Sequence, residues 1–496
     1  MSAAVFIAFA ILIGTTVVTA RLASRGRKVS LSEWAVGGGN FGAVLVWFLS
    51  AGEIYTTFAF LGGSGLAYAE GAPAFYILAN APLAYVLGYW IQPRIWAMSR
   101  LHGVYTQGDY FQLRFGNRWL ATLMALVAII GLVSYTELQL TGLTVILQVL
   151  FHGSVSKAVA VTVGAVLVII FTFTAGLRSM AFASIVKDVL VLGVLIALIV
   201  TVAGAVHLGS IGGVLSAVDS AHPAYGSLPG LLPKAHHGAA WFMTTILLTN
   251  IGYWMLPHLF QSTCAAKDIK TIRRNAIFQP LYGLSYFFVF VLGLTAIVAI
   301  PAVKDSNAAL VTLVAEVYPS WFIGLVAAAS MLVAIVPAAV LLLTVGTVFS
   351  QNVYRPLAPH AGDSQRLLAA RLASVVATLI AAALAVHSVS TIVAIILVVY
   401  AAIAQIAPGF VLSLLWRRVS AWGVAAGTII GVVGVTFPPA EDLLKSVSFR
   451  GNVGFTAFIV NFVVVVLVSL ITKPPAASAV NIGVLELQPA TAETPA

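Results

Sequence analysis

Long hydrophobic runs, separated by short polar stretches, fill the chain up to about residue 472. Residues 317–354 and 372–416 contain no Asp, Glu, Lys or Arg. About 20 apolar residues cross a bilayer as an α-helix, so the second stretch is long enough for two crossings joined by a turn near residues 387–391. The pattern predicts an all-α membrane protein with about 13 transmembrane helices, at residues 3–22, 41–68, 73–98, 119–150, 156–175, 183–206, 238–260, 276–301, 321–352, 367–388, 391–416, 421–437 and 453–472.

Composition and cysteine content agree with this pattern. Of the 496 residues, 61% are hydrophobic and 8% are charged. Soluble domains are about one quarter charged, so most of this surface must face lipid. The one cysteine, Cys264, excludes a disulfide framework and a cysteine-rich metal site.

The positions of the cations explain the net charge of +10. If the N-terminus lies outside, 19 of the 25 Lys and Arg residues fall in inside loops, 5 fall in outside loops, and Lys187 lies within a span. Inside loops of membrane proteins carry the excess of cations. We therefore expect a protein of the plasma (cytoplasmic or inner) membrane with its N-terminus outside and its C-terminus in the cytoplasm, and no nucleic-acid partner.

Two predicted spans carry helix-breaking and polar residues at mid-membrane depth. They lie at residues 50–58 (Ser-Ala-Gly-Glu-Ile-Tyr-Thr-Thr-Phe) and 249–258 (Thr-Asn-Ile-Gly-Tyr-Trp-Met-Leu-Pro-His). Backbone unwinds at that depth only where it is buried in protein or lines a cavity. Interrupted helices at matching positions in two halves indicate a secondary transporter with its binding site at the breaks. Glycine and proline that only ease helix packing are the alternative explanation.

At these residues the sequence resembles the sodium/solute symporter family over nearly its whole length. The resemblance implies a LeuT-type five-plus-five inverted repeat with discontinuous helices 1 and 6. Residues 33–38 and 50–65 are similar to the bacterial branch that includes monocarboxylate (lactate, pyruvate) uptake permeases. The motifs are Leu-Ser-Ala-Gly at 49–52, Gly-Tyr-Trp-x-x-Pro-His at 252–258, the loop at 265–274, and Pro-Gly at 408–409 leading to Trp-Arg-Arg at 416–418.

No loop is long enough for a soluble catalytic domain, and no metalloprotease, serine-hydrolase or ATP-binding motif is present, so we expect neither an enzyme nor a cofactor.

The family resemblance divides the chain into six parts. The parts are an extra helix and basic cytoplasmic loop at 1–40, the first repeat at 41–206, an outside loop at 207–237, the second repeat at 238–416, two C-terminal helices at 417–472, and a disordered cytoplasmic tail at 473–496.

The family resemblance also implies an ion site. It places the backbone of Glu53 and Thr56 where helix 1 carbonyl groups hold the conserved sodium ion. Helix 8 of the family supplies two hydroxyl groups to that ion, but the matching positions here are Val336 and Pro337. A shifted register would offer Thr344 or Thr347.

Helix 5 departs from the family as well, because Ser184 stands where a carboxylate is usual and Lys187 where a Gln is usual. Lys187 lies one helical turn beyond Ser184 on nearly the same face. We hypothesise that the Lys187 ammonium replaces sodium and that protonation of Lys187 or Glu53 couples transport to a proton gradient. The alternative is that Lys187 extends to the inner membrane surface.

Two other acids lie within the predicted spans. Glu137 is expected near the middle of helix 3, which faces the cavity in this fold, and is a possible proton site or a protonated acid bonded to a neighbouring helix. Asp188 adjoins Lys187 but points about 100° away on the helix, so a direct pair is not assured. Beyond this coupling-ion site (Glu53, Thr56, Ser184 and Lys187), no metal site is predicted.

The expected substrate is a small monocarboxylate such as lactate, pyruvate or acetate. Because no arginine is available within the spans, we expect N–H groups at the half-helix ends to hold the anion. A zwitterionic amino acid such as proline or alanine is the main alternative, and a channel or a sensor fits the sequence less well. We expect the protein to lie in the lipid bilayer as a monomer. The expected substrate-binding residues are Tyr55, Thr56, Thr57, Phe58, Asn250, Tyr253, Trp254 and Gln405.

Overall fold

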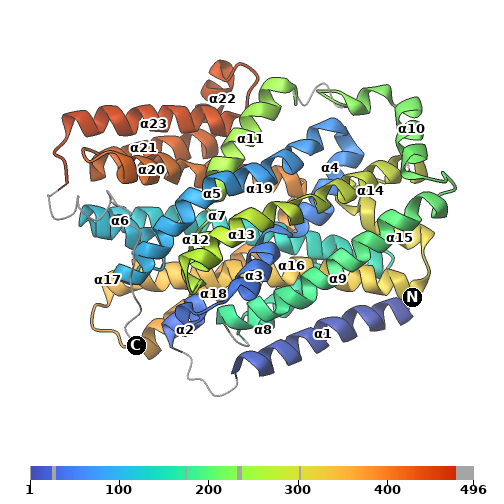
Figure 1. Cartoon of the computed structure of the whole chain (residues 1–496), viewed down its shortest axis with the longest axis horizontal. Helices are drawn as coiled ribbons and strands as arrows, with labels where there is room; N and C mark the ends of the chain where they lie inside the picture. Colours follow the sequence, from blue (N-terminus) through green and yellow to red (C-terminus); the bar gives the residue numbers. More distant parts are fainter. Residues whose placement is uncertain (1, 25–29, 174–175, 232–236, 301–302, 476–496) are drawn as a thin grey trace.

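The computed structural model describes residues 2–24, 30–173, 176–231, 237–300 and 303–475. Its described part is a bundle of helices that run mostly along one common direction (Figure 1). The basic residues Arg25, Arg27 and Lys28, and almost all of the tail predicted from residue 473, lie outside the described residues. The helices of the first half are α1 (Ser2–Ser24), α2 (Leu31–Val36), α3 (Ala43–Ile54), η2 (Phe58–Gly62), α4 (Gly63–Glu70), α5 (Tyr76–His102), α6 (Gln107–Phe115), α7 (Arg118–Leu150), α8 (Lys157–Phe173), α9 (Gly176–Ala205) and α10 (Ile211–Ala221).

The second half continues this arrangement. Its helices are α11 (Ala239–Tyr253), α12 (Pro257–Ala265), α13 (Ile269–Gly283), α14 (Ser285–Ala299), α15 (Ala309–Val317), α16 (Ser320–Phe349), η7 (Ser350–Tyr354), α17 (Arg355–Leu357), α18 (Asp363–His387), α19 (Ile392–Ile403), η8 (Ala404–Ile406), α20 (Ala407–Leu415), α21 (Ala421–Thr436), α22 (Pro438–Val447) and α23 (Val453–Ile471).

Each predicted span overlaps one or more helices of the described chain, but the number of crossings stays a prediction. Nine helices of the described chain are long and apolar enough to cross a membrane, or eleven if each of two bent pairs counts as one span. The span predicted at 156–175 is α8, with 17 residues, and the one at 238–260 is divided between α11, with 15 residues, and α12.

The core of the bundle is α16. Of its most apolar stretch 94% is buried, compared with 28% for α1 and for α23. In Figure 1, α16 passes through the middle, whereas α1 lies along one edge and α21 and α23 along the opposite edge. Since α16 carries no charged residue, its burial removes apolar surface without leaving a charge unpaired.

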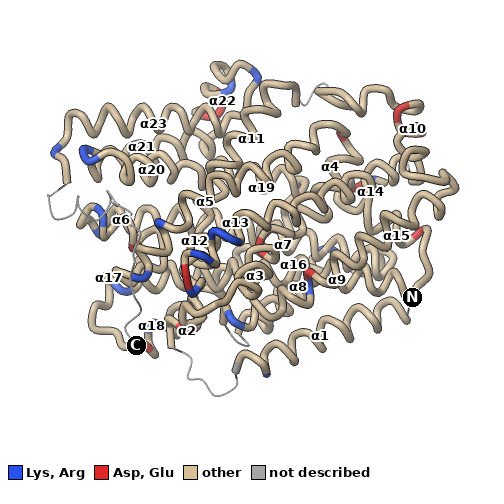
Figure 2. Tube along the Cα trace, in the orientation of Figure 1, with Lys and Arg blue, Asp and Glu red and all other residues tan. Residues whose placement is uncertain are grey.

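Lys and Arg residues gather mainly towards one end of the bundle (Figure 2). This end, called the basic end below, carries Arg100 at the end of α5, Arg114 in α6, Arg178 at the start of α9 and Arg355 in α17. The arrangement is what the positive-inside prediction requires of a cytoplasmic face. At the opposite end, the loop predicted at 207–237 contains the helix α10.

Candidate functional site

The first helix break exposes backbone carbonyl groups. α3 ends at Ile54 and η2 begins at Phe58, and the helix axis bends by 49° between the two segments. Carbonyl groups near such an end lose the N–H donors that a continuous helix would supply. Two of these carbonyl groups, on Gly52 and Tyr55, accept hydrogen bonds from a side chain of α9 instead.

That side chain is Lys187. Its Nζ donates hydrogen bonds to the Gly52 carbonyl at 3.2 Å and to the Tyr55 carbonyl at 2.9 Å. The expected carbonyl groups were those of Glu53 and Thr56, so each observed partner lies one residue earlier. The ammonium thus lies in the break, in contact with backbone oxygens of the kind that ligate sodium.

Asp188 completes the surroundings of this cation. Lys187 Nζ lies 2.7 Å from Asp188 Oδ1, and both side chains are fully buried. The Tyr282 hydroxyl donates to the same carboxylate oxygen at 3.0 Å. Lys187 therefore does not extend to the membrane surface, and the pair that the sequence left uncertain is formed. A buried ion pair of this kind is costly to desolvate and is held by its additional hydrogen bonds.

Close packing of α3 against α9 keeps Lys187 in place. A Cβ on Gly52 would lie 2.3 Å from Ser184 Oγ and 3.6 Å from Lys187 Cε. Only glycine allows the two helices to approach this closely. Ser184 Oγ is buried and has no hydrogen-bond partner among the described residues.

The α16 positions considered for ion binding are all buried. Val336 and Pro337 offer no side-chain oxygen. Thr344 and Thr347 have hydroxyl groups, and each donates to the carbonyl four residues earlier in α16 at 2.9 Å. Among the described residues, no group of three or more His, Cys, Asp or Glu side chains is placed to hold a metal ion.

Glu53 lies between two small cavities of the bundle. Its side chain lines both, and Ser262 of α12 donates a hydrogen bond to its Oε1. The other carboxylate oxygen is buried without a partner among the described residues. Glu53 therefore links the first broken helix to the second one.

The larger of these, the central cavity, lies between the two helix breaks. Its volume is about 30 Å³, which holds about two water molecules. Five tyrosines, an amide, an imidazole and the carboxyl group of Glu53 supply polar atoms to its wall. The lining residues are Glu53, Ile54, Phe58, Ile77, Asn80, Ala81, Tyr85, Tyr135, Tyr253, Leu256, His258, Leu259, Tyr286 and Tyr400.

Of the predicted substrate-binding residues, Phe58 and Tyr253 line this cavity. Tyr253 shares a hydrogen bond of 3.2 Å with the Tyr85 hydroxyl. Tyr55 stacks on Tyr286 with ring centroids 5.4 Å apart. Trp254 fills space beside the second cavity, where its indole N–H donates to the Ala84 carbonyl.

The two threonines of the break bind neighbouring side chains of α7. Thr56 Oγ1 lies 3.4 Å from the Tyr135 hydroxyl. The Thr57 hydroxyl donates to Gln139 Oε1 at 2.5 Å, and the Thr57 N–H points at the same oxygen. Both threonines therefore attach the first break to α7.

Three predicted residues lie apart from the central cavity. Asn250 donates to the Ile246 carbonyl in its own helix. Gln405 donates to backbone carbonyls of Ala401 and Gly454 and packs towards α23. Glu137 is half-buried, with Lys157 and Ser388 as its polar neighbours.

Most of the cavity wall was not predictable from the sequence. Tyr85, Tyr135, Tyr286 and Tyr400 come from four different helices, and nothing in the local sequence distinguishes them from tyrosines that only pack. His258, the last residue of the stretch at 249–258, lines the cavity with its Nδ1 buried and without a partner among the described residues.

Comparison with known proteins assigns the chain to a family. The model of the Sodium:solute symporter family matches residues 34–431. The chain belongs to this family. One similar protein is the Uncharacterized symporter YhjB of Bacillus subtilis (strain 168), 35% identical, with 97% of this chain and 99% of that protein covered. The Monocarboxylate transport permease protein of Rhizobium johnstonii (strain DSM 114642 / LMG 32736 / 3841) is 31% identical, with 88% of each covered.

Solved structures confirm the fold of this symporter family member. A Na⁺-coupled sialic acid symporter in a substrate-bound outward-open state matches 96% of this chain and 98% of its own with a TM-score of 0.77 at 16% identity. Mhp1, a nucleobase-cation-symport-1 family transporter, matches 92% of this chain and 99% of its own chain, with a TM-score of 0.55 at 12% identity. The symporter is thus an integral membrane transporter of LeuT-type fold and not an enzyme.

Proposed function

We propose that this symporter takes up a small monocarboxylate by alternating access and that a proton, carried by Lys187, replaces sodium as the coupling ion. The contact of the Lys187 ammonium with the Gly52 and Tyr55 carbonyl groups carries this proposal. A cation held by backbone oxygens in a helix break needs no second cation beside it. Positive charges placed together at such a point would repel each other strongly, because few water molecules are present to screen them.

The proton on Lys187 would control the first break. While Lys187 is charged, it holds the carbonyl groups of Gly52 and Tyr55 and the Asp188 carboxylate together. Loss of the proton leaves a neutral amine and an unpaired carboxylate, which weakens all of these contacts. We infer that protonation from outside favours the closed, substrate-loaded site and that release of the proton inside permits opening.

The cavity wall supports a small anion with a polar and an apolar part. The hydroxyl groups of Tyr85, Tyr135 and Tyr253 are donors for a carboxylate, whereas Phe58 and Leu259 suit a short aliphatic tail. The named monocarboxylate permease among the similar proteins supports the same class. A volume of about 30 Å³ is too small for lactate, so the wall must move apart to load it.

An amino acid remains the second candidate substrate. The Osmoregulated proline transporter OpuE of Bacillus subtilis (strain 168) is 22% identical over 93% of this chain. The carboxylate of Glu53 faces the central cavity and could pair with an amine. The two candidates differ in the charge that they present to Glu53.

Competition for uptake of labelled pyruvate tests the substrate class. We expect unlabelled acetate and lactate to reduce pyruvate uptake and alanine and proline to leave it unchanged. Competition by the amino acids alone would refute the monocarboxylate proposal. Tyr253→Phe, which removes one donor from the cavity, should raise KM for pyruvate about 5- to 15-fold, in line with 1–1.5 kcal/mol for a hydrogen bond. The matched control is Tyr318→Phe, whose hydroxyl bonds to Thr201 away from the cavity; it should keep the wild-type KM.

A further inference from the structure

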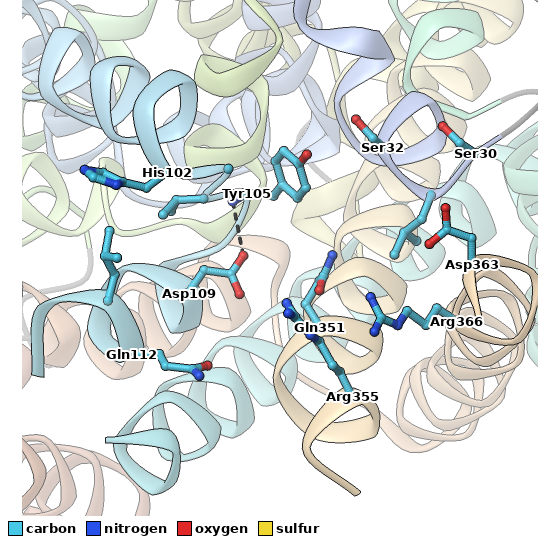
Figure 3. Close-up of a pocket in the computed structure, with 14 residues that line it drawn as sticks. Ser30, Ser32, His102, Tyr105, Asp109, Gln112, Gln351, Arg355, Asp363 and Arg366 are labelled. Carbon is cyan, nitrogen blue, oxygen red and sulfur yellow. Dashed lines mark hydrogen bonds between the residues drawn. The ribbon is translucent and has the colours of Figure 1, made fainter. Parts of the chain in front are cut away.

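A second pocket lies at the basic end, apart from the central cavity. Its volume is about 670 Å³, which is within the range of small-ligand sites. Five segments form its wall: the start of α2, the α5–α6 connection, α6, η7 with α17, and the start of α18 (Figure 3). Neither Lys187 nor any residue of the central cavity contributes to it.

Two guanidinium groups in this pocket have no partner within the described chain. Arg355 and Arg366 come from different helices, and Figure 3 shows both extending to the neighbourhood of Gln351. No hydrogen bond or ion pair to either guanidinium is found among the described residues, and Arg366 Nε is buried without an acceptor. A buried donor left unpaired costs about 1–3 kcal/mol, so this position favours an additional acceptor.

Gln351 gives an independent indication of a ligand. Its side chain lines the same pocket and is 8% exposed, and its Oε1 has no hydrogen-bond partner among the described residues. Ser30 and Ser32 add hydroxyl groups from the α2 side. The wall therefore offers two cations, an amide and two hydroxyl groups to one guest.

The two carboxylates of the pocket do not neutralise these cations. Asp109 accepts hydrogen bonds from the Tyr105 and Thr106 N–H groups and from Asn352 Nδ2. Burial raises the pKa of Asp109 above its usual range, although these hydrogen bonds act against the shift. Asp363 is the first residue of α18, where the positive end of the helix dipole stabilises its carboxylate. In Figure 3 it lies on the Ser30 side of the pocket.

We propose that this pocket binds a phosphate group, and that Arg355 and Arg366 are its principal ligands. Two guanidiniums are suited to a dianionic phosphate, because each can donate paired hydrogen bonds to its oxygens. A protonated phosphate oxygen, or a hydroxyl group next to the phosphate in the ligand, would donate a hydrogen bond to Gln351 Oε1. The guest is either a soluble phosphate compound or the headgroup of an anionic lipid, since the pocket opens at the basic end.

A bound phosphate would hinder the opening of the bundle at the basic end. It would bridge α2 to η7 and α18. α2 leads into the broken helix α3, and Glu33 in α2 already contacts Arg178 of α9 at 3.5 Å. Attachment of α2 at a second point would oppose its outward movement and keep the basic end closed.

Binding of inorganic phosphate and pyrophosphate to the full-length protein tests this proposal. Calorimetry in phosphatidylcholine nanodiscs should detect saturable binding of at least one probe. Arg355→Gln and Arg366→Gln should each weaken it about tenfold or more, as expected for a charge-assisted hydrogen bond. The control, Lys270→Gln with Arg417→Gln, removes two cations at the same end outside this pocket and should bind as the wild type does.

Repeating the titration with phosphatidylglycerol in the nanodiscs distinguishes the two sources. Unchanged binding supports a soluble phosphate compound, and competitive loss of binding in wild type supports a lipid headgroup. No binding of either probe in phosphatidylcholine, or an equal loss in the control variant, would overturn the proposal. Arg355 is exposed, so Arg355→Gln should fold even if Arg366→Gln does not.

Discussion

Lys187 introduces a positive charge into a buried part of the bundle, where a charge within a span costs about 2.5–3.5 kcal/mol even on the mildest scale. Asp188 and two backbone carbonyl groups offset that cost. All three partners favour the protonated amine. Under the proposed mechanism the charge of Lys187 has two roles: it holds the first break together, and its loss with the proton releases the break.

Replacement of Lys187 by methionine should abolish both its structural role and its proposed role in coupling. Lys187→Met leaves Asp188 buried without its cation, so we expect a loss of about 3–5 kcal/mol in stability. Thermal unfolding in detergent measures this change. In liposomes the variant should show no accumulation driven by a pH gradient.

The double variant Lys187→Met/Asp188→Asn provides the control for this experiment. It removes the unpaired charge, so much of the lost thermal stability should return while pH-driven accumulation stays absent. Return of accumulation together with stability would mean that Lys187 has only a structural role.

At the same scale, the sequence identified charges better than neutral polar groups. Lys187 and Glu53 stand out because each is a charge within a long apolar run. Tyr85 and Tyr400 do not, because an isolated tyrosine in a span is as common in packing as in binding. Their convergence depends on how the helices pack, which no local pattern specifies.

At the scale of the helix, the contact between α3 and α9 fixes the position of Lys187. Gly52→Ala would place a Cβ 2.3 Å from Ser184 Oγ, and the two helices would have to separate. Overpacking of this kind costs about 1–3 kcal/mol. We expect lower thermal stability and at least a tenfold loss of uptake, because Lys187 would lose its reach to both carbonyl groups.

The partner variant Gly52→Ala/Ser184→Gly checks this explanation. It removes the side chain that the new methyl group meets, and uptake should recover at least partly. If Ser184→Gly fails to improve the Gly52→Ala protein at all, steric pressure between these helices is not the cause.

Helix positions and both breaks were predictable from the sequence, and shorter elements were not. Long apolar runs locate the spans, and Gly52 with Pro257 indicates the breaks. α10 was not predicted within the polar loop, although Val214 and Val218 lie one turn apart and are both buried. α22 turns by 92° from α21, which depends on Pro438 and Pro439 and on packing beyond the local sequence.

At the scale of the whole molecule, the two ends of the bundle differ in charge, and this difference predicts the orientation. Two cysteine variants test it in a Cys264→Ala background, which removes the one native thiol. An impermeant maleimide should label Lys445→Cys in intact cells and Arg417→Cys only after lysis. The reverse pattern would contradict a cytoplasmic C-terminus.

Uptake by the purified protein in liposomes tests the central claim most directly. The two arms use labelled pyruvate with an imposed pH gradient, acid outside, or with an inward sodium gradient at equal pH. With one proton per substrate, a gradient of one pH unit, worth about 1.36 kcal/mol, should drive about tenfold accumulation without sodium. The sodium gradient alone should drive none. Accumulation that depends on the sodium gradient and ignores the pH gradient would contradict the assignment of Lys187 as the substitute for sodium.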